Sequence, residues 1–289
     1  MRLDTKTLGL VATTVLGYVI GNYVAYDYCL KKSFEPEVYE LPFSVSIVVT
    51  AAYEPDALLE VSLSSLRSQS LIKCDKNNIE IILVAGKGVN VDIAKRYCDK
   101  IIMEDSARGE LPPGKLTARH IGICEAKGDI IVATDADTYY PPGWLAQLLK
   151  PYLRTATVVA THGPCIGLTE YTHGDVRPIL GWWSFCTYYG VNISGRNSSF
   201  VKSAYFATGG FDLNAQKTFD KLLWEEEFAF KKRLQKVGKV KFVPTAVALT
   251  FDYEKFKKTR GLRRTTRYRD ELHGIAISFK YWLKSLISP

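Results

Sequence analysis

Short apolar strands alternate with helical segments from Phe43 onward, and this alternation limits the fold of the chain more than any other feature. Apolar runs of strand character occupy five stretches: 44–50, 79–84, 100–103, 129–134 and 156–161. Segments with apolar residues at helical spacing separate them, at 55–66, 91–98, 115–126 and 142–153. Strands joined by helices of this length predict an α/β fold with a mostly parallel sheet, covered by helices on both faces, that binds ligands at its carboxyl edge.

Asp135 and Asp137 stand one residue apart directly after the apolar run 129–134, where a buried strand is expected to meet solvent. An Asp-x-Asp pair is also common in solvated turns, but this position favours a hard-oxygen site for a divalent cation. Mg²⁺ prefers one or two carboxylates together with substrate phosphates over a cage made only of protein. The pair therefore predicts Mn²⁺ or Mg²⁺ held with a diphosphate, and hence a nucleotide-linked substrate.

The composition excludes a wholly disordered protein, because 289 residues with 47% hydrophobic content can bury a substantial core. The six cysteines are widely spaced and include no Cys-x-x-Cys pair: Cys29, Cys74, Cys98, Cys124, Cys165 and Cys186. This spacing indicates neither a zinc site nor a disulfide framework. We therefore expect reduced and mostly buried thiols.

The N-terminal segment 7–28 begins with a run from Thr7 to Tyr26 that carries no charge. The run just reaches across a bilayer core of about 30 Å, so we predict a single transmembrane anchor rather than a cleaved signal peptide or a buried helix. Residues 1–6 would form a tail before the anchor and 29–42 a linker after it. Basic residues flank the anchor on both sides, and we place the main domain, 43–250, in the cytosol.

The C-terminal segment 251–289 contains a basic stretch at 255–269 with eight lysines and arginines and no acid, which equals the net charge of +8. The stretch suits a solvated face, an RNA-binding patch, or a strip that faces anionic lipid or a diphosphate. Only two aromatic residues lie among its cations, so stacking on nucleic acid is not favoured. Residues 275–287 fit an interfacial amphipathic helix or a helix packed on the main domain.

Four further motifs follow one another along the main domain: Thr50-Ala-Ala-Tyr-Glu-Pro55, Gly114-Lys-Leu-Thr-Ala-Arg-His120, Gly209-Gly-Phe-Asp212 and Trp224-Glu-Glu-Glu-Phe-Ala-Phe-Lys-Lys-Arg-Leu234. In this order and spacing, together with the Asp-x-Asp pair, they resemble those of the family 2 inverting glycosyltransferases, which have the GT-A nucleotide-sugar fold. The resemblance implies that 43–250 is a GT-A catalytic domain. It also implies that Ala51, Tyr53 and Glu54 cradle the base of a nucleoside diphosphate sugar, the donor.

The resemblance extends to the residues around the diphosphate. Lys115 and Arg119, one helical turn apart, would contact the phosphates or the ribose, although ordinary helix cations are the alternative. Asp135 would reach the ribose or the metal, and Asp137 would bind the metal directly. The cation would then neutralise the departing diphosphate, which is the main electrostatic demand of the reaction.

The catalytic base is expected in the last motif, where the alignment of its Arg-Leu pair puts Glu227 on the base position and Glu226 before it. An inverting transfer needs one carboxylate to take the proton of the acceptor hydroxyl. Acids at a helix N-terminus are also favoured by the helix dipole, so a structural role is the alternative. Glu here replaces the usual Asp, which moves the carboxylate by about one methylene group, and a shift of about 1 Å matters in a positioned site.

On the acceptor side, the resemblance points to Gly210 and Asp212 of the Gly-Gly-Phe-Asp motif. Asp212 would orient the acceptor or cap a turn. Trp182 and Trp183 lie in an irregular, aromatic region and would stack on a sugar ring or fill a core. Long irregular stretches of this kind are often binding loops.

The chain departs from the family at the end of the second strand, where members commonly have Val-Asp-Asp-Gly-Ser and this chain has Val84-Ala-Gly-Lys-Gly88. Both acids are absent, which leaves a uridine or a guanosine donor open. We expect a metal-dependent inverting enzyme that moves a single sugar to a lipid-linked or glycan acceptor at the membrane. Two alternatives are a catalytically silent nucleotide-sugar or glycan-binding scaffold and an RNA-binding protein.

Overall fold

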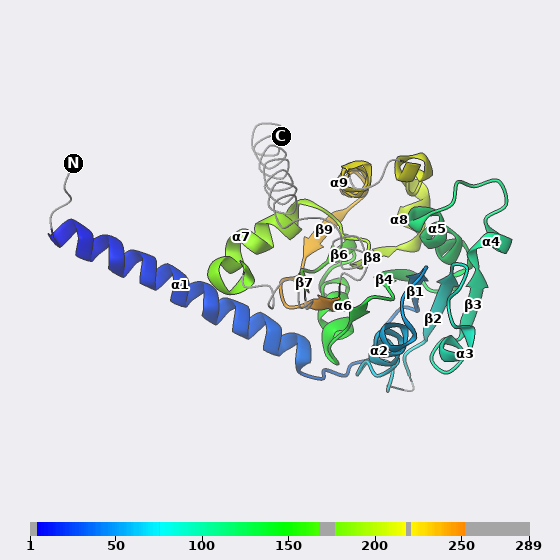
Figure 1. Cartoon of the computed structure of the whole chain (residues 1–289), viewed down its shortest axis with the longest axis horizontal. Coiled ribbons are helices and arrows are strands. Elements are labelled where there is room, and N and C mark those ends of the chain that lie inside the picture. Colours follow the sequence, from blue (N-terminus) through cyan, green and yellow to red (C-terminus); the bar gives the residue numbers. More distant parts are fainter. Residues whose placement is uncertain (1–4, 75, 168–176, 218–220, 252–289) are drawn as a thin grey trace.

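The computed structural model describes residues 5–74, 76–167, 177–217 and 221–251 (Figure 1). The basic stretch at 255–269 and the amphipathic segment at 275–287 lie outside the described residues. The strands and helices predicted between 44 and 161 are found there, and two further elements, 104–107 and 138–139, lie among them.

The central sheet has seven strands in the order β3-β2-β1-β4-β8-β6-β9. Their bounds are β1 Val45–Ala51, β2 Ile79–Ala85, β3 Lys100–Met103, β4 Ile130–Asp135, β6 Val158–His162, β8 Asn197–Val201 and β9 Lys239–Phe242. Only β8 runs antiparallel to its neighbours β4 and β6 in this sheet, so the sheet is mostly parallel, as predicted. After β1, the chain first adds β2 and β3 on one side of β1 and then adds β4 on the other side. The strand order therefore reverses beside β1, and open α/β sheets bind their ligands at this kind of switch point.

A second sheet of three short strands lies next to the end of β4. It comprises β5 (Thr138–Tyr139), β10 (Ala248–Thr250) and β7 (Cys165–Gly167), with β10 in the middle. After β10, the backbone N–H of Phe251 donates to the carbonyl of Asp137 at 2.8 Å. This small sheet therefore holds the segment that contains the second aspartate. The sequence did not predict it, because strands of two or three residues show no periodicity.

Helices cover both faces of the central sheet. One face is packed by α2 (Asp56–Arg67), α3 (Val91–Ala94) and α6 (Trp144–Arg154), whose buried apolar side chains join those of β1, β2 and β4. The other face is packed by α5 (Lys115–Glu125), α8 (Lys202–Ala207) and α9 (Lys221–Gln235), around an aromatic cluster that includes Phe200, Tyr205 and Phe230. A short helix, α4 (Glu104–Ala107), precedes α5, and a 3₁₀ helix, η2 (Leu213–Lys217), precedes α9.

The predicted membrane anchor is wrong. The helix α1 (Thr5–Phe34) runs without a break through residues 7–28 and into the predicted linker, and none of the described helices is long and apolar enough to cross a membrane. Polar residues interrupt it: Asn22 is buried, and its Oδ1 accepts a hydrogen bond from the backbone N–H of Trp183 at 3.0 Å. The predicted cytosolic placement of the main domain depended on this anchor, so the structure does not support that placement either.

The C-terminal part of α1 is instead a packed helix. It lies against α7 (Arg177–Val191), where Cys29 of α1 shares a buried cluster with Phe185 and Cys186 of α7. Figure 1 shows this arrangement, with the N-terminal part of α1 extending beyond the rest of the molecule. Within 13–34, only Asn22, Cys29 and Ser33 are buried, so this part is a helix that packs on α7 along one side and not the buried helix that was the alternative to an anchor.

Candidate active site

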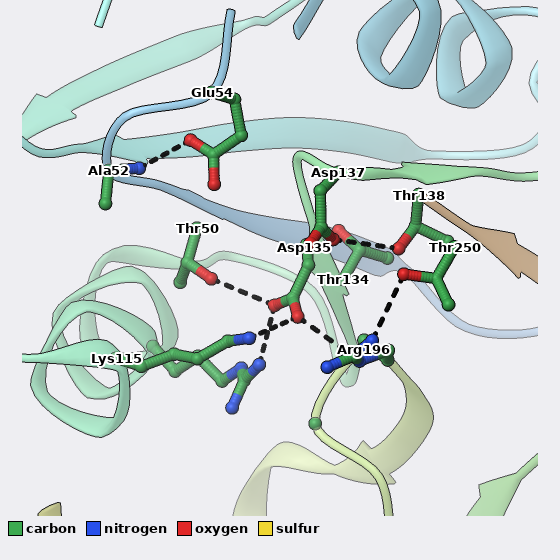
Figure 2. A network of polar contacts seen from close by, with 12 residues as sticks. Thr50, Ala52, Glu54, Lys115, Thr134, Asp135, Asp137, Thr138, Arg196 and Thr250 are labelled. Atoms are coloured by element: carbon green, nitrogen blue, oxygen red, sulfur yellow. Dashed lines mark hydrogen bonds and ion pairs between the residues drawn. The ribbon is translucent and has the colours of Figure 1, made fainter. Parts of the chain in front are cut away.

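Asp135 is the last residue of β4, and its carboxylate is the centre of a cluster of positive charge at the carboxyl edge of the sheet (Figure 2). Its two oxygens contact Lys115 Nζ, Arg119 Nη2 at 2.6 Å and Arg196 Nε at 3.7 Å. Thr50 Oγ1 of β1 donates a further hydrogen bond at 3.1 Å. Burial raises the pKa of this carboxyl, but the three cations outweigh burial and hold the pKa below its ordinary value. We call Lys115, Arg119 and Arg196 the cationic cluster.

Two members of the cationic cluster come from α5. Lys115 and Arg119 lie one turn apart, so both side chains reach the end of the neighbouring β4. Lys115 is partly open to solvent, with 39% of its side chain exposed, whereas the Arg119 side chain is 2% exposed. The Arg119 guanidinium lies so close to Gly195 that a Cβ at that position would be 2.2 Å from Nη1. Arg119 is therefore a fixed cation and Lys115 a more mobile one.

The third member, Arg196, was not predicted. It precedes β8, which pairs with β4 so that Thr134 lies opposite Asn197. Its Nη1 donates to Thr250 Oγ1 of β10 at 3.1 Å, and its carbonyl accepts a hydrogen bond from Tyr140 at 3.0 Å. The same Tyr140 hydroxyl accepts the N–H of Asp135 at 3.0 Å. The sequence marked Gly195-Arg196-Asn197 only as an irregular segment, and no local pattern places it beside Asp135.

Asp137 lies two residues after Asp135, and its carboxylate is partly exposed. Its Oδ1 accepts a hydrogen bond from Thr138 Oγ1 at 3.2 Å, and its carbonyl is held by Phe251. Between the two aspartates, the buried Ala136 donates its N–H to Thr50 O at 3.1 Å. The pair is thus fixed in a backbone turn, and the two carboxylates differ in exposure.

Glu227 of α9 lies near the cationic cluster, because the Gly195 to which it is bonded packs against Arg119. Its Oε1 accepts the backbone N–H of Gly195 at 3.0 Å, and its Oε2 accepts Asn192 Nδ2 at 3.0 Å. Burial raises the pKa of this carboxyl, while the Gly195 N–H and then the three cations of the cluster act to lower it. Glu227 and Asp135 therefore lie around the same cations.

Glu226 has a different environment from its neighbour. Its Oε1 accepts Arg233 Nη2 at 2.6 Å and the N–H of Asp212 at 2.7 Å, and the residue is buried. Arg233 also donates to the carbonyl of Gly210 at 2.8 Å, and Gly210 has a φ of 67°, which favours glycine. Asp212 is exposed, and its Oδ1 accepts Asn214 N at 3.0 Å within the turn that begins η2. Glu226 thus ties the Gly-Gly-Phe-Asp turn to α9.

The loop after β1 is organised by Glu54. Its Oε2 accepts the N–H of Ala52 at 2.7 Å and the N–H of Tyr53 at 3.1 Å. Tyr53 is exposed over 61% of its surface, and Ala51 is buried at the end of the strand. Burial raises the pKa of Glu54, the N–H of Ala52 lowers it, and the two nearby aspartates raise it again.

The two tryptophans expected on the acceptor side are separated by the fold. Trp182 is 1% exposed and packs edge-on against Tyr26 of α1 and parallel to Phe185. Trp182 is therefore a core residue, and its predicted contact with an acceptor is corrected: the alternative, that it fills a core, describes it. Trp183 is 61% exposed, and its side chain remains available at the surface of α7.

The sequence profile described as Glycosyl transferase family 2 matches residues 46–217, which is more than half of the chain. The chain belongs to this family. No curated protein shows a significant match to this glycosyltransferase. Among solved structures, it is similar to the mannosyltransferase PcManGT from Pyrobaculum calidifontis in complex with GDP-Man and Mn²⁺. The identity is 19% and the TM-score 0.53, over 87% of this chain and 70% of that one.

This family 2 glycosyltransferase is also similar to GalNAc-T7 with UDP, GalNAc and Mn²⁺. The identity is 16% and the TM-score 0.53, over 86% of this chain and 53% of that one, so the chain spans about half the length of GalNAc-T7. At these identities the two likenesses show the fold alone. The predicted GT-A fold and the predicted glycosyltransferase class are confirmed.

Proposed function

We propose that this glycosyltransferase transfers a single sugar from a nucleoside diphosphate donor to an acceptor hydroxyl, with inversion at the anomeric carbon and Glu227 as general base. One observation carries the proposal: Arg119 pairs with Asp135 at 2.6 Å and packs against Gly195, whose N–H donates to Glu227 at 3.0 Å. A carboxylate suited to the donor side and a carboxylate suited to the acceptor side therefore border one positively charged space. A diphosphate is the anion that such a space fits.

The residues present fit a hard divalent cation. Asp135 and Asp137 would hold Mn²⁺ or Mg²⁺ as two carboxylates, and these ions complete their coordination with phosphate oxygens rather than with further protein ligands. Among the described residues, no group of three or more histidine, cysteine, aspartate or glutamate side chains is placed to hold a metal ion. When bound, the cation would neutralise charge that develops on the departing diphosphate.

The cationic cluster would hold the phosphates. Arg119 is fixed by burial, and Arg196 is anchored at Thr250, so neither needs to move when the donor enters. Lys115 is partly exposed and can turn from Asp135 toward a phosphate oxygen. The cluster would stay in place as the bond between the anomeric carbon and the diphosphate oxygen breaks, which is where electrostatic stabilisation is most effective.

Glu227 would accept the proton of the acceptor hydroxyl as the acceptor oxygen bonds to the anomeric carbon. Each of its oxygens already accepts one hydrogen bond, which orients the carboxylate and leaves further lone pairs for the proton. Burial makes the group a stronger base than an exposed glutamate. A single displacement of this kind inverts the anomeric configuration. Glu226, predicted beside the base, would act as a positioning residue through Arg233 and Asp212.

The acceptor class, a lipid-linked or glycan molecule, stays a prediction from the sequence. Trp183, Gly210 and Asp212 keep their proposed places on the acceptor side. Among these, Trp183 offers an exposed aromatic ring on which a sugar could stack.

Glu227→Gln tests the proposal. The variant should reduce release of nucleoside diphosphate from a panel of UDP-sugars and GDP-sugars, measured with Mn²⁺ and lipid-linked or glycan acceptors, by about 100-fold to 10,000-fold. Donor affinity should change by less than about threefold, because the base meets the acceptor rather than the phosphates.

Glu125→Gln is the matched control, since Glu125 forms an exposed ion pair with Lys100 and should leave the rate unchanged. An active wild-type chain whose Glu227→Gln variant keeps its full rate would exclude Glu227 as the base. A wild-type chain that binds donors but releases no nucleoside diphosphate would favour the silent scaffold.

A further inference from the structure

Lys231 of α9 holds the carboxyl end of α7. Its Nζ donates a hydrogen bond to the carbonyl of Gly190, the last residue but one of α7. The last four carbonyls of a helix have no partner within the helix, and a cation near this end also interacts favourably with the helix dipole. Lys231 therefore ties the end of α7 to α9.

The segment 192–196 leads from this end of α7 to β8 and carries the groups that surround Glu227. Asn192 Nδ2 donates to one oxygen of Glu227 and the N–H of Gly195 to the other, each at 3.0 Å. Arg196, the last residue of the segment, belongs to the cationic cluster. A displacement of this segment would therefore disturb both hydrogen bonds of Glu227.

Glu227 and Lys231 lie one turn apart on α9, so both side chains project from the same side of this helix. The helix thus meets the segment 192–196 at two points: Lys231 holds the end of α7 from which the segment starts, and Glu227 accepts its two donors. At its other end the segment joins β8, which pairs with β4 and β6. Both ends of a short segment are therefore fixed, one of them by Lys231.

Resting on the proposed function, we infer that Lys231 is a positioning residue for the general base. Its ammonium group holds the segment 192–196 in the place where Asn192 and Gly195 orient the carboxylate of Glu227 toward the acceptor hydroxyl. The cations around the diphosphate have other supports, because two of them come from α5 and Arg196 is anchored at Thr250. Loss of the ammonium group should therefore slow the transfer and leave donor binding unchanged.

The charge of Lys231 also changes within an accessible range of pH. Burial, and then the charge of Lys232, lower the pKa of Lys231 to about 8. Of the other titratable groups around it, Glu227 lies one turn earlier on α9, and His162 at the end of β6 is neutral because burial and the charge of Lys231 lower its pKa. The lysines of β9, which also packs on α9, are exposed. A neutral amine is a weaker donor than an ammonium ion, so kcat should fall as pH rises through about 8.

Lys231→Met tests the inference, because it keeps most of the side chain and removes the ammonium group. The assay uses the full chain with Mn²⁺, at saturating concentrations of a donor and an acceptor that give transfer with the wild type. A displacement of about 1 Å at the base should lower kcat about 10-fold to 100-fold, while the Kd of the donor, measured by calorimetry, changes by less than about threefold.

Two further variants separate the charge of Lys231 from the bulk of its side chain. Lys231→Arg has a guanidinium group that stays charged, so it should keep kcat within about threefold of the wild type and remove the fall of kcat at alkaline pH. Lys232→Met is the matched control: it removes an exposed cation from the next position and should keep the wild-type kcat at neutral pH.

The Glu227→Gln chain separates positioning of the base from a general loss of structure. A residue that acts through the base has nothing to position once the base is absent. Lys231→Met should therefore lower the residual rate of Glu227→Gln by less than about twofold. The fall of the wild-type kcat at alkaline pH tests the inference even if Lys231→Met does not fold.

A folded Lys231→Met variant with the wild-type kcat would overturn the inference alone, as would a Lys231→Arg variant that is as slow as Lys231→Met. A wild-type kcat that stays constant as pH rises through about 8 would do the same. So would a loss on Lys231→Met that is as large in the Glu227→Gln chain as in the wild type. If Glu227→Gln keeps the full rate, the inference fails together with the proposed function.

Discussion

Replacing Gly195 with alanine should disable both sides of the site with one methyl group. A Cβ at this position would lie 2.2 Å from Arg119 Nη1 and 2.4 Å from its Cζ. Those atoms end a flexible side chain, which could move aside in an open site, but Arg119 is buried and bonded to Asp135 at 2.6 Å. The backbone cannot retreat freely either, because the N–H of Gly195 holds Glu227.

The size of the effect follows from these contacts. Carbon contacts are normally about 3.5–4.0 Å, so Arg119 or the Gly195 loop must shift by more than about 1 Å. A hydrogen bond to a charged group contributes about 1.5–3 kcal/mol, and Asp135 keeps two other cations, so the free energy of unfolding should fall by about that amount. For a domain of this size, that lowers Tm by roughly 3–12 °C. A misplacement of about 1 Å should lower kcat/KM about 100-fold or more.

The assay is steady-state release of nucleoside diphosphate, with Tm measured on the same samples. Gly190→Ala is the control, because a Cβ there meets no atom within 4 Å. It should behave as the wild type in both measurements. A Gly195→Ala variant with wild-type kcat/KM and wild-type Tm would refute the arrangement in which Arg119 and Glu227 meet at this glycine.

Three further predictions concern separate parts of the molecule. Burial raises the pKa of Glu227, and a general base acts only when it is ionised. The value of kcat/KM should therefore rise with pH through a pKa above the ordinary glutamate value, and Glu227→Gln should remove this rise. Trp182 is buried, so Trp182→Ala should lower the free energy of unfolding, measured by urea denaturation, by about 3–5 kcal/mol. Trp183 is exposed, so Trp183→Ala should change this free energy by less than about 0.5 kcal/mol. Equal losses in the two variants would contradict the assigned burial. Asp137→Asn should weaken binding of the donor in the presence of Mn²⁺ about 10-fold to 100-fold, measured by calorimetry. Binding of the donor to the cationic cluster without metal should stay unchanged. An equal loss of affinity with and without Mn²⁺ would contradict a role for Asp137 in holding the metal.

Local patterns predicted the central elements because the strands are mostly apolar runs and the helices carry apolar residues at helical spacing. The stretch predicted at 44–50 is β1, Val45–Ala51, in which every residue is buried. The stretch at 129–134 is β4, and the helix expected at 115–126 is α5. A parallel strand covered on both faces reads as one continuous hydrophobic run, so its position depends little on distant parts of the chain.

The parts that escaped prediction depend on distant partners. Arg196 reaches Asp135 only because β8 inserts beside β4, and nothing within its own segment indicates that pairing. The helix α1 is a similar case: its uncharged run resembles a membrane span, but its polar Asn22 is satisfied by α7. Trp182 is buried by the same contact between helices. In each case, the residue type suits either an exposed or a packed position, and contacts with distant parts of the chain determine which of the two it occupies.

Asp135 and Glu227 show how two carboxylates near one set of cations can acquire opposite pKa shifts. Asp135 touches the cationic cluster directly, so its pKa falls and it stays ionised as an anchor for cations. Glu227 accepts hydrogen bonds from the uncharged donors Gly195 N–H and Asn192 Nδ2, and burial outweighs the more distant effect of the cations, so its pKa rises. An acid that gives up its proton readily is a poor base, and an acid that holds it more tightly is a better one. Charged donors at Asp135 and uncharged donors at Glu227 thus distinguish a residue suited to hold the donor from one suited to deprotonate the acceptor.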